Sequence, residues 1–189
     1  MSFIDLNKKN NDGNELLPAG TYEMIIDSVH GDASKGGHEN MSFDMIVRRD
    51  LDQVKSLAKT NAVAHGRHYF SRVWTAKDAN GRDSGKYNPT DLANIADAIG
   101  LTQAQVDKYI KSKDDLFRAC KGKPIRIYVS VNDNEYNGER RKQNSTFTNS
   151  WQKTRFPLNA KKSAPTEPKD PFKGNKGAAD EDISNSLPF

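Results

Sequence analysis

Pro124-Ile125-Arg126-Ile127-Tyr128-Val129-Ser130-Val131 is the clearest strand pattern in this chain of 189 residues. Isoleucine and valine occupy every second position of this stretch, and Arg126, Tyr128 and Ser130 lie between them. Alternate residues of a strand face opposite sides, so one face of this strand is apolar and the other is polar. The stretch therefore predicts a half-buried strand of an antiparallel sheet.

Three strands are predicted before this one. After the turn residues Pro18-Ala19-Gly20, Tyr22, Met24 and Ile26 alternate with Glu23, Ile25 and Asp27, and residues 41–47 repeat the same period of two. A third run, His68 to Thr75, is rich in aromatic and β-branched residues, which favour strands.

Two helices are predicted between the third strand and the one at 124–131. Asn88 is suited to cap the first helix with Pro89 at its first position, and Gly100 is placed to stop it. Thr102 and Gln105 have the spacing of a capping box for the second helix. The apolar side of the second helix continues through Cys120.

The remaining segments complete the order of elements. We expect a mobile loop over residues 30–40, a mostly helical insertion over 49–66, and a hairpin at Asn137-Gly138 inside a long polar loop. A last strand is expected from Thr146 to Lys153. The result is a mainly β (α+β) chain of three strands, helices, then two strands, which is the order of a five-stranded OB-fold barrel with helices between strands 3 and 4. A small sandwich has the same order.

Composition divides the chain into four regions. Residues 1–17 form a polar leader and residues 18–158 a folded domain. Residues 159–179, rich in Lys, Pro, Gly and Ala, predict a flexible linker, and residues 180–189 an acidic tip. We expect the linker and tip to form a disordered C-terminal tail.

The overall composition indicates a soluble, polar chain with a modest core. Its hydrophobic content is 34% and its mean hydropathy −0.87, and no apolar run approaches the roughly 18 residues of a membrane span. The single cysteine excludes an internal disulfide and favours a reducing, cytoplasmic location. Removing the three tip acids takes the acidic count from 25 to 22 against 29 basic residues, so residues 1–179 carry a net charge of +7. This balance suits a polyanion partner.

The third strand carries the main candidate binding residues. If Tyr69 and Val73 face the core, the opposite face presents two large aromatic rings around an arginine, with an imidazole behind: His68, Phe70, Arg72 and Trp74. Aromatic rings bind unpaired bases by stacking, whatever the base, and an arginine between them suits a phosphate. The alternative is that Phe70 and Trp74 belong to the core and Tyr69 and Val73 face solvent.

Two further groups extend this candidate surface. Arg126 and Tyr128 form an outward aromatic and basic pair on the strand at 124–131, although a tyrosine at a barrel seam is an alternative. The following loop carries Tyr136, Arg140, Arg141 and Lys142, which suit contacts with backbone phosphates. A solvated charged turn is the alternative reading of that loop.

The order of four short motifs resembles a family of bacteriophage single-stranded DNA-binding proteins, long described only as a domain of unknown function. The motifs are Leu17-Pro18-Ala19-Gly20-Thr21-Tyr22-Glu23, Phe43-Asp44-Met45-Ile46-Val47, Gly122-Lys123-Pro124-Ile125-Arg126-Ile127 and Glu135-Tyr136-Asn137-Gly138-Glu139. The resemblance covers roughly residues 17–152. It implies an OB-fold, binding of single-stranded DNA without sequence preference, a role in phage DNA replication, recombination or repair, and a location in the host bacterial cytoplasm.

The tip has the chemistry of a docking segment. Three acids precede an apolar end, and its candidate contact residues are Asp180, Glu181, Asp182, Ile183, Leu187, Pro188 and Phe189. It resembles the acidic tip by which bacterial single-stranded DNA-binding proteins recruit replication and recombination partners, but Ser184-Asn185-Ser186-Leu187 separates Ile183 from the final Pro-Phe. Such a tip is also suited to cover the basic surface when DNA is absent. A frayed, solubilising terminus is the alternative.

Catalytic and metal-binding patterns are absent from the sequence. The histidines lack zinc spacing, and neither a P-loop nor a Rossmann fingerprint is present. We therefore expect no enzyme activity, metal or cofactor. The alternatives to DNA binding are a protein-binding adaptor that mimics a host tail, and a recombination accessory factor. A homo-oligomer is compatible with either.

Overall fold

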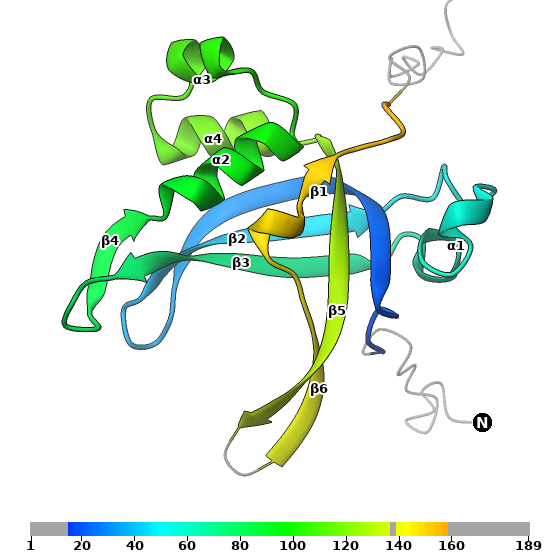
Figure 1. Cartoon of the computed structure of the whole chain (residues 1–189), viewed down its shortest axis with the longest axis horizontal. Coiled ribbons are helices and arrows are strands. Elements are labelled where there is room, and N and C mark those ends of the chain that lie inside the picture. The colour runs from blue at the N-terminus through cyan, green and yellow to red at the C-terminus, as the bar shows by residue number, and fades with distance from the viewer. Residues whose placement is uncertain (1–14, 137–138, 159–189) are drawn as a thin grey trace, which may run out of the picture. The chain divides into compact units, whose positions relative to one another are not determined.

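The chain is built on one antiparallel sheet, and the computed structural model describes residues 15–136 and 139–158 of it (Figure 1). The predicted linker, the tip and most of the leader lie outside these ranges. The elements, in order, are β1 (Gly20–Ala33), β2 (Glu39–Val47), η1 (Lys55–Leu57), α1 (Asn61–Ala64), β3 (His68–Lys77), β4 (Asp83–Tyr87), α2 (Pro89–Ala98), α3 (Gln103–Tyr109), α4 (Lys113–Cys120), β5 (Pro124–Tyr136), β6 (Glu139–Ser145), η2 (Thr148–Ser150) and β7 (Gln152–Lys153).

The strands follow the order β4-β3-β2-β1-β5-β6, and β7 pairs with β5. The long β1 strand is shared between two halves of the sheet, since it pairs with β2 from Met24 to Ala33 and with β5 from Gly20 to Ile25. A mainly β chain with a few helices is thus confirmed. The predicted five-stranded barrel needs correction, because the described sheet has seven strands and is not closed into a barrel.

Two local features keep the sheet from closing, one at β3 and one at residues 146–153. The pairing of β4 with β3 involves only Thr75 and Lys77, so among the described residues the edge of β3 that faces away from β2 has no strand partner from His68 to Trp74. Residues 146–153, predicted as the last strand, instead form η2 and the two-residue β7. The Ser150 hydroxyl donates to the Phe147 carbonyl over 2.8 Å, which favours a turn over an extended strand.

The core lies on the faces that alternation predicted. The inward residues of β1, β2 and β5 are completely buried: Tyr22, Met24, Ile26, Met41, Phe43, Met45, Val47, Ile125, Ile127 and Val129. Phe43 also packs its ring edge-on against Trp151, with centroids 5.0 Å apart, so the segment after β6 is held onto the sheet.

Helix capping follows the sequence closely. The Asn88 side chain accepts a hydrogen bond from the Thr90 amide at the start of α2, and Thr102 and Gln105 form the predicted capping box of α3. The expected second helix is nevertheless two helices, because Ser112 and Asp115 form a further capping box that begins α4. Gly100 has φ 81°, a conformation that suits glycine and ends α2.

Three sequence expectations for the connections need correction, and one strand was not predicted. The predicted loop at 30–40 is shorter, since β1 runs on to Ala33, and β4 was not predicted. The insertion at 49–66 contains only η1 and α1 as helical turns. The predicted long polar loop is instead a hairpin whose strands pair up to Tyr136 and Glu139, and the predicted turn residues Asn137 and Gly138 lie outside the described residues.

A strap at residues 154–156 covers the outer side of β1. The Glu23 carboxylate is fully buried and accepts hydrogen bonds from the Thr154 hydroxyl (2.5 Å) and the Arg155 amide (3.1 Å). The buried Arg48 guanidinium donates to the Phe156 carbonyl. These bonds satisfy two charged groups that would otherwise be costly to bury, and they fix where the chain leaves the sheet.

Candidate nucleic-acid interface

The outer face of β3 presents aromatic rings to solvent. Along this strand exposed and buried residues alternate, with Tyr69 and Val73 buried and His68, Phe70, Arg72 and Trp74 exposed. Phe70 is 65% exposed and Trp74 39% exposed, so the alternative that these rings form the core is excluded. Large aromatic side chains are usually buried, because their exposure to water is unfavourable. Rings that stay exposed are therefore candidates for binding a ligand or partner.

Histidines hold both rings in place. The His38 ring lies 4.9 Å from the Trp74 ring at an interplanar angle of 32°, and its Nε2 is 2.9 Å from the Thr75 carbonyl oxygen. The His68 ring lies 6.2 Å from that of Phe70 and bonds the Asp44 carboxylate over 2.8 Å. Sequence reasoning placed His38 in a loop without a role, because a contact across strands has no local signal.

The β4 hairpin supports the Trp74 end of this surface. The Thr75 hydroxyl donates to the Asp83 carboxylate over 2.5 Å, and the backbone amides of Glu39 and Gly85 donate to the same group. These hydrogen bonds, the one from Thr75 first, lower the pKa of Asp83 to about 2. Asp83 therefore stays ionised near neutral pH and ties β4 to the end of β3 beside Trp74.

A second exposed pair lies on β5. Tyr128 is 50% exposed, and Arg126, two residues earlier on the same face, is partly buried. The Arg126 guanidinium lies 3.5 Å from the side-chain oxygen of Gln152 on β7. The predicted outward orientation of both residues is confirmed, and a seam position for Tyr128 is excluded by its exposure.

Phe147 lies between the exposed residues of β3 and those of β5. It was not identified as a candidate binding residue from the sequence. It is 69% exposed, and the hydroxyl of its neighbour Thr146 donates to the Tyr128 carbonyl over 2.7 Å. Residues 146–153 were predicted to form a strand, so the Phe147 ring was not considered as a surface residue. An aromatic among Thr, Asn and Ser was the available signal.

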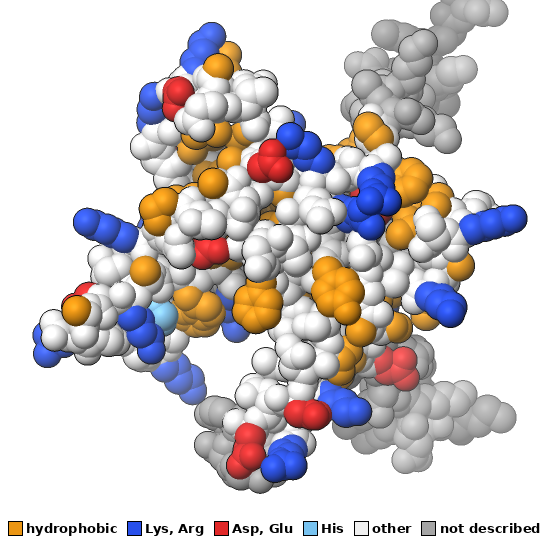
Figure 2. Space-filling model, viewed as in Figure 1, with side chains coloured by type: hydrophobic (Ala, Val, Ile, Leu, Met, Phe, Trp, Pro, Cys, Tyr) orange, Lys and Arg blue, Asp and Glu red, His pale blue; other side chains and the backbone are white. Residues whose placement is uncertain are grey.

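Four exposed rings and three arginines make up the set of residues that we call the aromatic surface: Phe70, Arg72, Trp74, Arg126, Tyr128, Phe147 and Arg155. Some of them line two separate hollows, and Phe70 lines neither. A hollow of about 630 Å³ lies between β3 and η2 and is lined by Arg72, Trp74 and Phe147. A smaller one of about 260 Å³ is lined by Arg126, Tyr128 and Arg155. Figure 2 shows hydrophobic side chains gathered on the face between β3 and β5, with Lys and Arg at its borders.

This arrangement is found in a chain whose residues 4–165 match the family described as "Protein of unknown function (DUF669)". The chain belongs to that family. The match spans the sheet, the helices and the aromatic surface of this DUF669 chain. No curated protein matches its sequence. The family description names no function, so the proposal below depends on the geometry of the chain.

The basic residues of the hairpin are less available than the sequence predicted. Arg140, Arg141 and Lys142 lie on β6 opposite Glu135, Asn134 and Asp133 of β5, and Arg140 is 3.6 Å from the Glu135 carboxylate. Their positive charge is thus partly balanced within the hairpin. Figure 1 shows the β5–β6 arm extending away from β3, so these residues lie apart from the aromatic rings. Tyr136 is the last residue of β5.

Other predicted sites fall outside the aromatic surface. All seven candidate contact residues of the tip lie outside the described ranges. Within those ranges no group of three or more His, Cys, Asp or Glu side chains is arranged to hold a metal ion. In the same ranges no helix is long and apolar enough to span a bilayer.

Cys120 is a buried residue of α4, and burial raises the pKa of its thiol to about 12. A thiol with such a pKa stays protonated at pH 8 and is a poor nucleophile. We expect Ellman's reagent to modify native protein at least about a hundred-fold more slowly than a Lys113→Cys variant, whose new thiol is exposed. One equivalent should react in urea. Rapid reaction of the native protein would contradict this burial.

Proposed function

We propose that this DUF669 chain binds single-stranded DNA without sequence preference. The observation that carries the proposal is the aromatic surface, where four exposed rings on β3, on β5 and just before η2 are interleaved with Arg72, Arg126 and Arg155. Bases stack on such rings regardless of identity, and the guanidinium groups suit the phosphates between them. Duplex DNA keeps its bases stacked inside and gains little from the rings.

The strand order supports an OB-like arrangement in an open form. Three consecutive strands pair as neighbours, β1 also pairs with β5, and the helices lie between β4 and β5. OB-folds bind oligonucleotides on the face of their second and third strands, which here are β2 and β3. Phe70 and Trp74 lie on that face.

The charged residues that line the two hollows favour a polyanion over a neutral partner. Three arginines line the two hollows, and Asp91, the one acid among their lining residues, accepts a hydrogen bond from the Thr148 hydroxyl. Binding that releases counterions falls steeply with salt.

The deciding experiment is a titration with oligo-dT and with duplex DNA of equal length at several salt concentrations. Trp74 fluorescence reports stacking directly, since its ring is partly exposed, whereas Trp151 is buried. We expect tighter binding of oligo-dT, with quenching that a Trp74→Phe variant lacks. Equal affinity for duplex and oligo-dT would refute the proposal.

Arg72 provides a more specific test of phosphate contact. Removing one phosphate contact from a single-strand complex lowers the slope of log K against log salt by about 0.7. We expect Arg72→Ala to show this decrease, and Arg118→Ala to show none, because the Arg118 side chain is exposed on α4 and pairs with Asp115. An unchanged slope for Arg72→Ala would mean that this arginine contacts no phosphate.

A protein-binding adaptor is the second candidate, and the open edge of β3 favours it. Unpaired strand edges accept a strand from another protein. In that case the rings would contact side chains, and oligo-dT would bind no better than duplex. The proposed roles in phage replication, recombination or repair, and the recruitment of partner proteins by the tip, follow from the first candidate.

A further inference from the structure

The smaller hollow of the aromatic surface has the chemistry of an anion site. It lies over the paired strands β1, β5 and β7, and we call it the β5 hollow. Its volume of about 260 Å³ is below the roughly 300–1,000 Å³ of sites that hold whole drug-sized ligands, so it suits a single small group. Two of its lining residues are arginines and none is acidic: Thr21, Arg126, Tyr128, Ser150, Gln152 and Arg155.

Strand register brings these side chains together. Thr21 lies opposite Tyr128 where β1 pairs with β5, and Arg126 lies opposite Gln152 where β5 pairs with β7. Arg126 and Tyr128 are two residues apart on one strand, so they share a face. The Arg126 guanidinium is 3.5 Å from the Gln152 side-chain oxygen, at the limit of a hydrogen bond, so most of its five donors are available to a ligand.

The strap brings the second arginine to the same hollow. The backbone amide of Arg155 donates to the fully buried Glu23 carboxylate over 3.1 Å, which fixes the Arg155 backbone without using its guanidinium. Glu23 is also the residue opposite Arg126 in the register of β1 and β5. Its two carboxylate oxygens accept from Arg155 and from the Thr154 hydroxyl, and within the described residues it forms no ion pair with either arginine.

Several donors of the hollow have no partner. Within the part of the chain that the structure describes, the hydroxyls of Thr21 and Tyr128 and the Arg155 guanidinium form no hydrogen bond or ion pair. Tyr128 and Arg155 are also exposed to solvent. The β5 hollow therefore offers an incoming anion two guanidinium groups and two hydroxyl donors.

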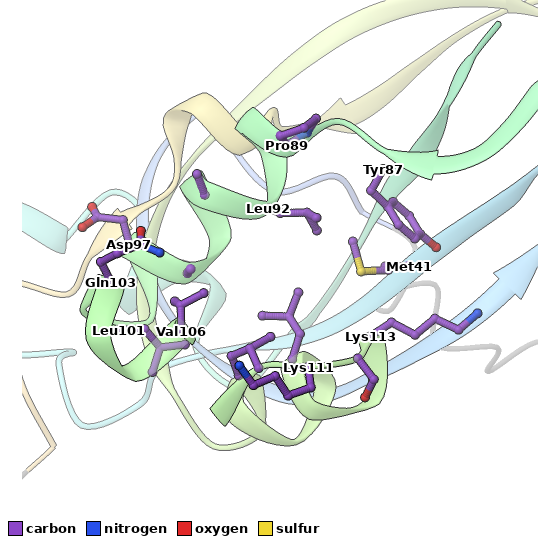
Figure 3. Close-up of a pocket in the computed structure, with 15 residues that line it drawn as sticks. Met41, Tyr87, Pro89, Leu92, Asp97, Leu101, Gln103, Val106, Lys111 and Lys113 are labelled. Atoms are coloured by element: carbon purple, nitrogen blue, oxygen red, sulfur yellow. The ribbon is translucent and has the colours of Figure 1, made fainter. Parts of the chain in front are cut away.

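The cavity among the helices differs in this respect. It has a volume of about 720 Å³ and a mostly apolar wall, and Figure 3 shows Lys111 and Lys113 at its border. Both lysines are engaged elsewhere, since Lys113 pairs with Glu39 over 3.8 Å and Lys111 donates to the Asp107 carbonyl. Of these two sites, only the β5 hollow has arginines available for an anion.

We propose that the β5 hollow binds a phosphate monoester, the group found at a phosphorylated end of a DNA strand. A monoester carries a charge of about −1.5 to −2 near pH 7 and three acceptor oxygens, which match two guanidinium groups and the adjacent hydroxyls. A phosphate inside a strand is a diester with one negative charge, for which one arginine suffices. The strand end as the source of the monoester rests on the proposed function, whereas the site itself does not.

Methyl phosphate and dimethyl phosphate test the site without any DNA. At pH 8 the monoester is a dianion, because its second pKa is about 6, while the diester keeps a single charge. We expect the amide NMR signals of Thr21 and Tyr128 to report binding of methyl phosphate at least about ten-fold tighter than that of dimethyl phosphate, since the second charge meets a second guanidinium. The signals of Ser71 and Val73, which line the other hollow, should not move.

Oligo-dT with and without a terminal phosphate connects the site to DNA. We expect a phosphate at the 5′ or the 3′ end to raise the affinity about five-fold or more at low salt. Arg155→Ala should abolish this gain and stay folded, because the backbone amide that bonds Glu23 is kept. Arg72→Ala is the matched control: it should weaken both oligonucleotides equally and leave the gain intact, since Arg72 lines the other hollow.

Two results would overturn the proposal. Equal affinity for methyl phosphate and dimethyl phosphate would show that the hollow does not recognise a monoester. A preference that persists in both Arg126→Ala and Arg155→Ala, with folding checked by circular dichroism, would place the monoester elsewhere. A preference for methyl phosphate without any gain from a strand end would keep the site and assign it to a small phosphate ester.

Failure of this proposal and failure of the proposed function give different results. Tighter binding of oligo-dT than of duplex, with no preference for methyl phosphate, would refute only the monoester site. A preference for methyl phosphate, with equal binding of oligo-dT and duplex, would refute only the proposed function.

Discussion

Replacing Phe70 and Trp74 together by alanine is expected to lower the affinity for oligo-dT at least about thirty-fold while the protein stays folded. Each base stacked on an aromatic ring contributes about 1–3 kcal/mol, so two rings contribute about 2–6 kcal/mol. Both side chains are exposed on the outer face of β3, so their removal creates no cavity in the core. The affinity is measured by fluorescence anisotropy of labelled oligo-dT, which does not depend on the deleted tryptophan.

The control for this experiment is another exposed aromatic. Tyr109 on α3 is 59% exposed and lies outside the aromatic surface, so Tyr109→Ala should bind oligo-dT like the wild type. The urea midpoint of the double variant should match that of the wild type. Wild-type affinity in the double variant would show that these rings contact no bases.

Phe43→Ala is expected to destabilise the protein by about 3–5 kcal/mol. Phe43 is fully buried on β2, and its ring contacts Trp151 edge-on at 5.0 Å, so truncation removes buried area and leaves a cavity. For a chain of this size each kcal/mol lowers the melting temperature by roughly 2–4 °C. Urea unfolding followed by circular dichroism measures the loss of stability.

Phe147→Ala is the matched control, because it deletes the same atoms from an exposed ring. We expect its stability to stay within about 0.5 kcal/mol of the wild type, while its affinity for oligo-dT falls about five-fold or more. Comparable destabilisation by both substitutions would mean that Phe147 is packed as tightly as Phe43, and would remove it from the aromatic surface.

Local sequence signals predicted the parts of the fold that depend on local physics. Alternation placed the buried faces of β1, β2 and β5, because a strand packed on one side must expose every second residue. Capping residues placed the starts of α2 and α3. For β3 alternation left both faces open, and only the burial of Tyr69 and Val73 in the structure shows that Phe70 and Trp74 face outward.

Features that depend on distant contacts were not predictable. The break between α3 and α4 arises from the Ser112 and Asp115 capping box, which competes with an otherwise continuous apolar helix face. The sheet stays open because residues 146–150 turn back on themselves instead of pairing with β3. The contact of His38 with Trp74 has no local signature, and Phe147 was marked only by being an aromatic residue among small polar ones.

The strap at 154–156 has a mechanical consequence. Its hydrogen bonds run to Glu23 in the central strand and to Arg48 just after β2, not only to the two-residue β7. A force applied at Leu158 is therefore transmitted to β1 and to the end of β2, and not to the two-residue β7 alone.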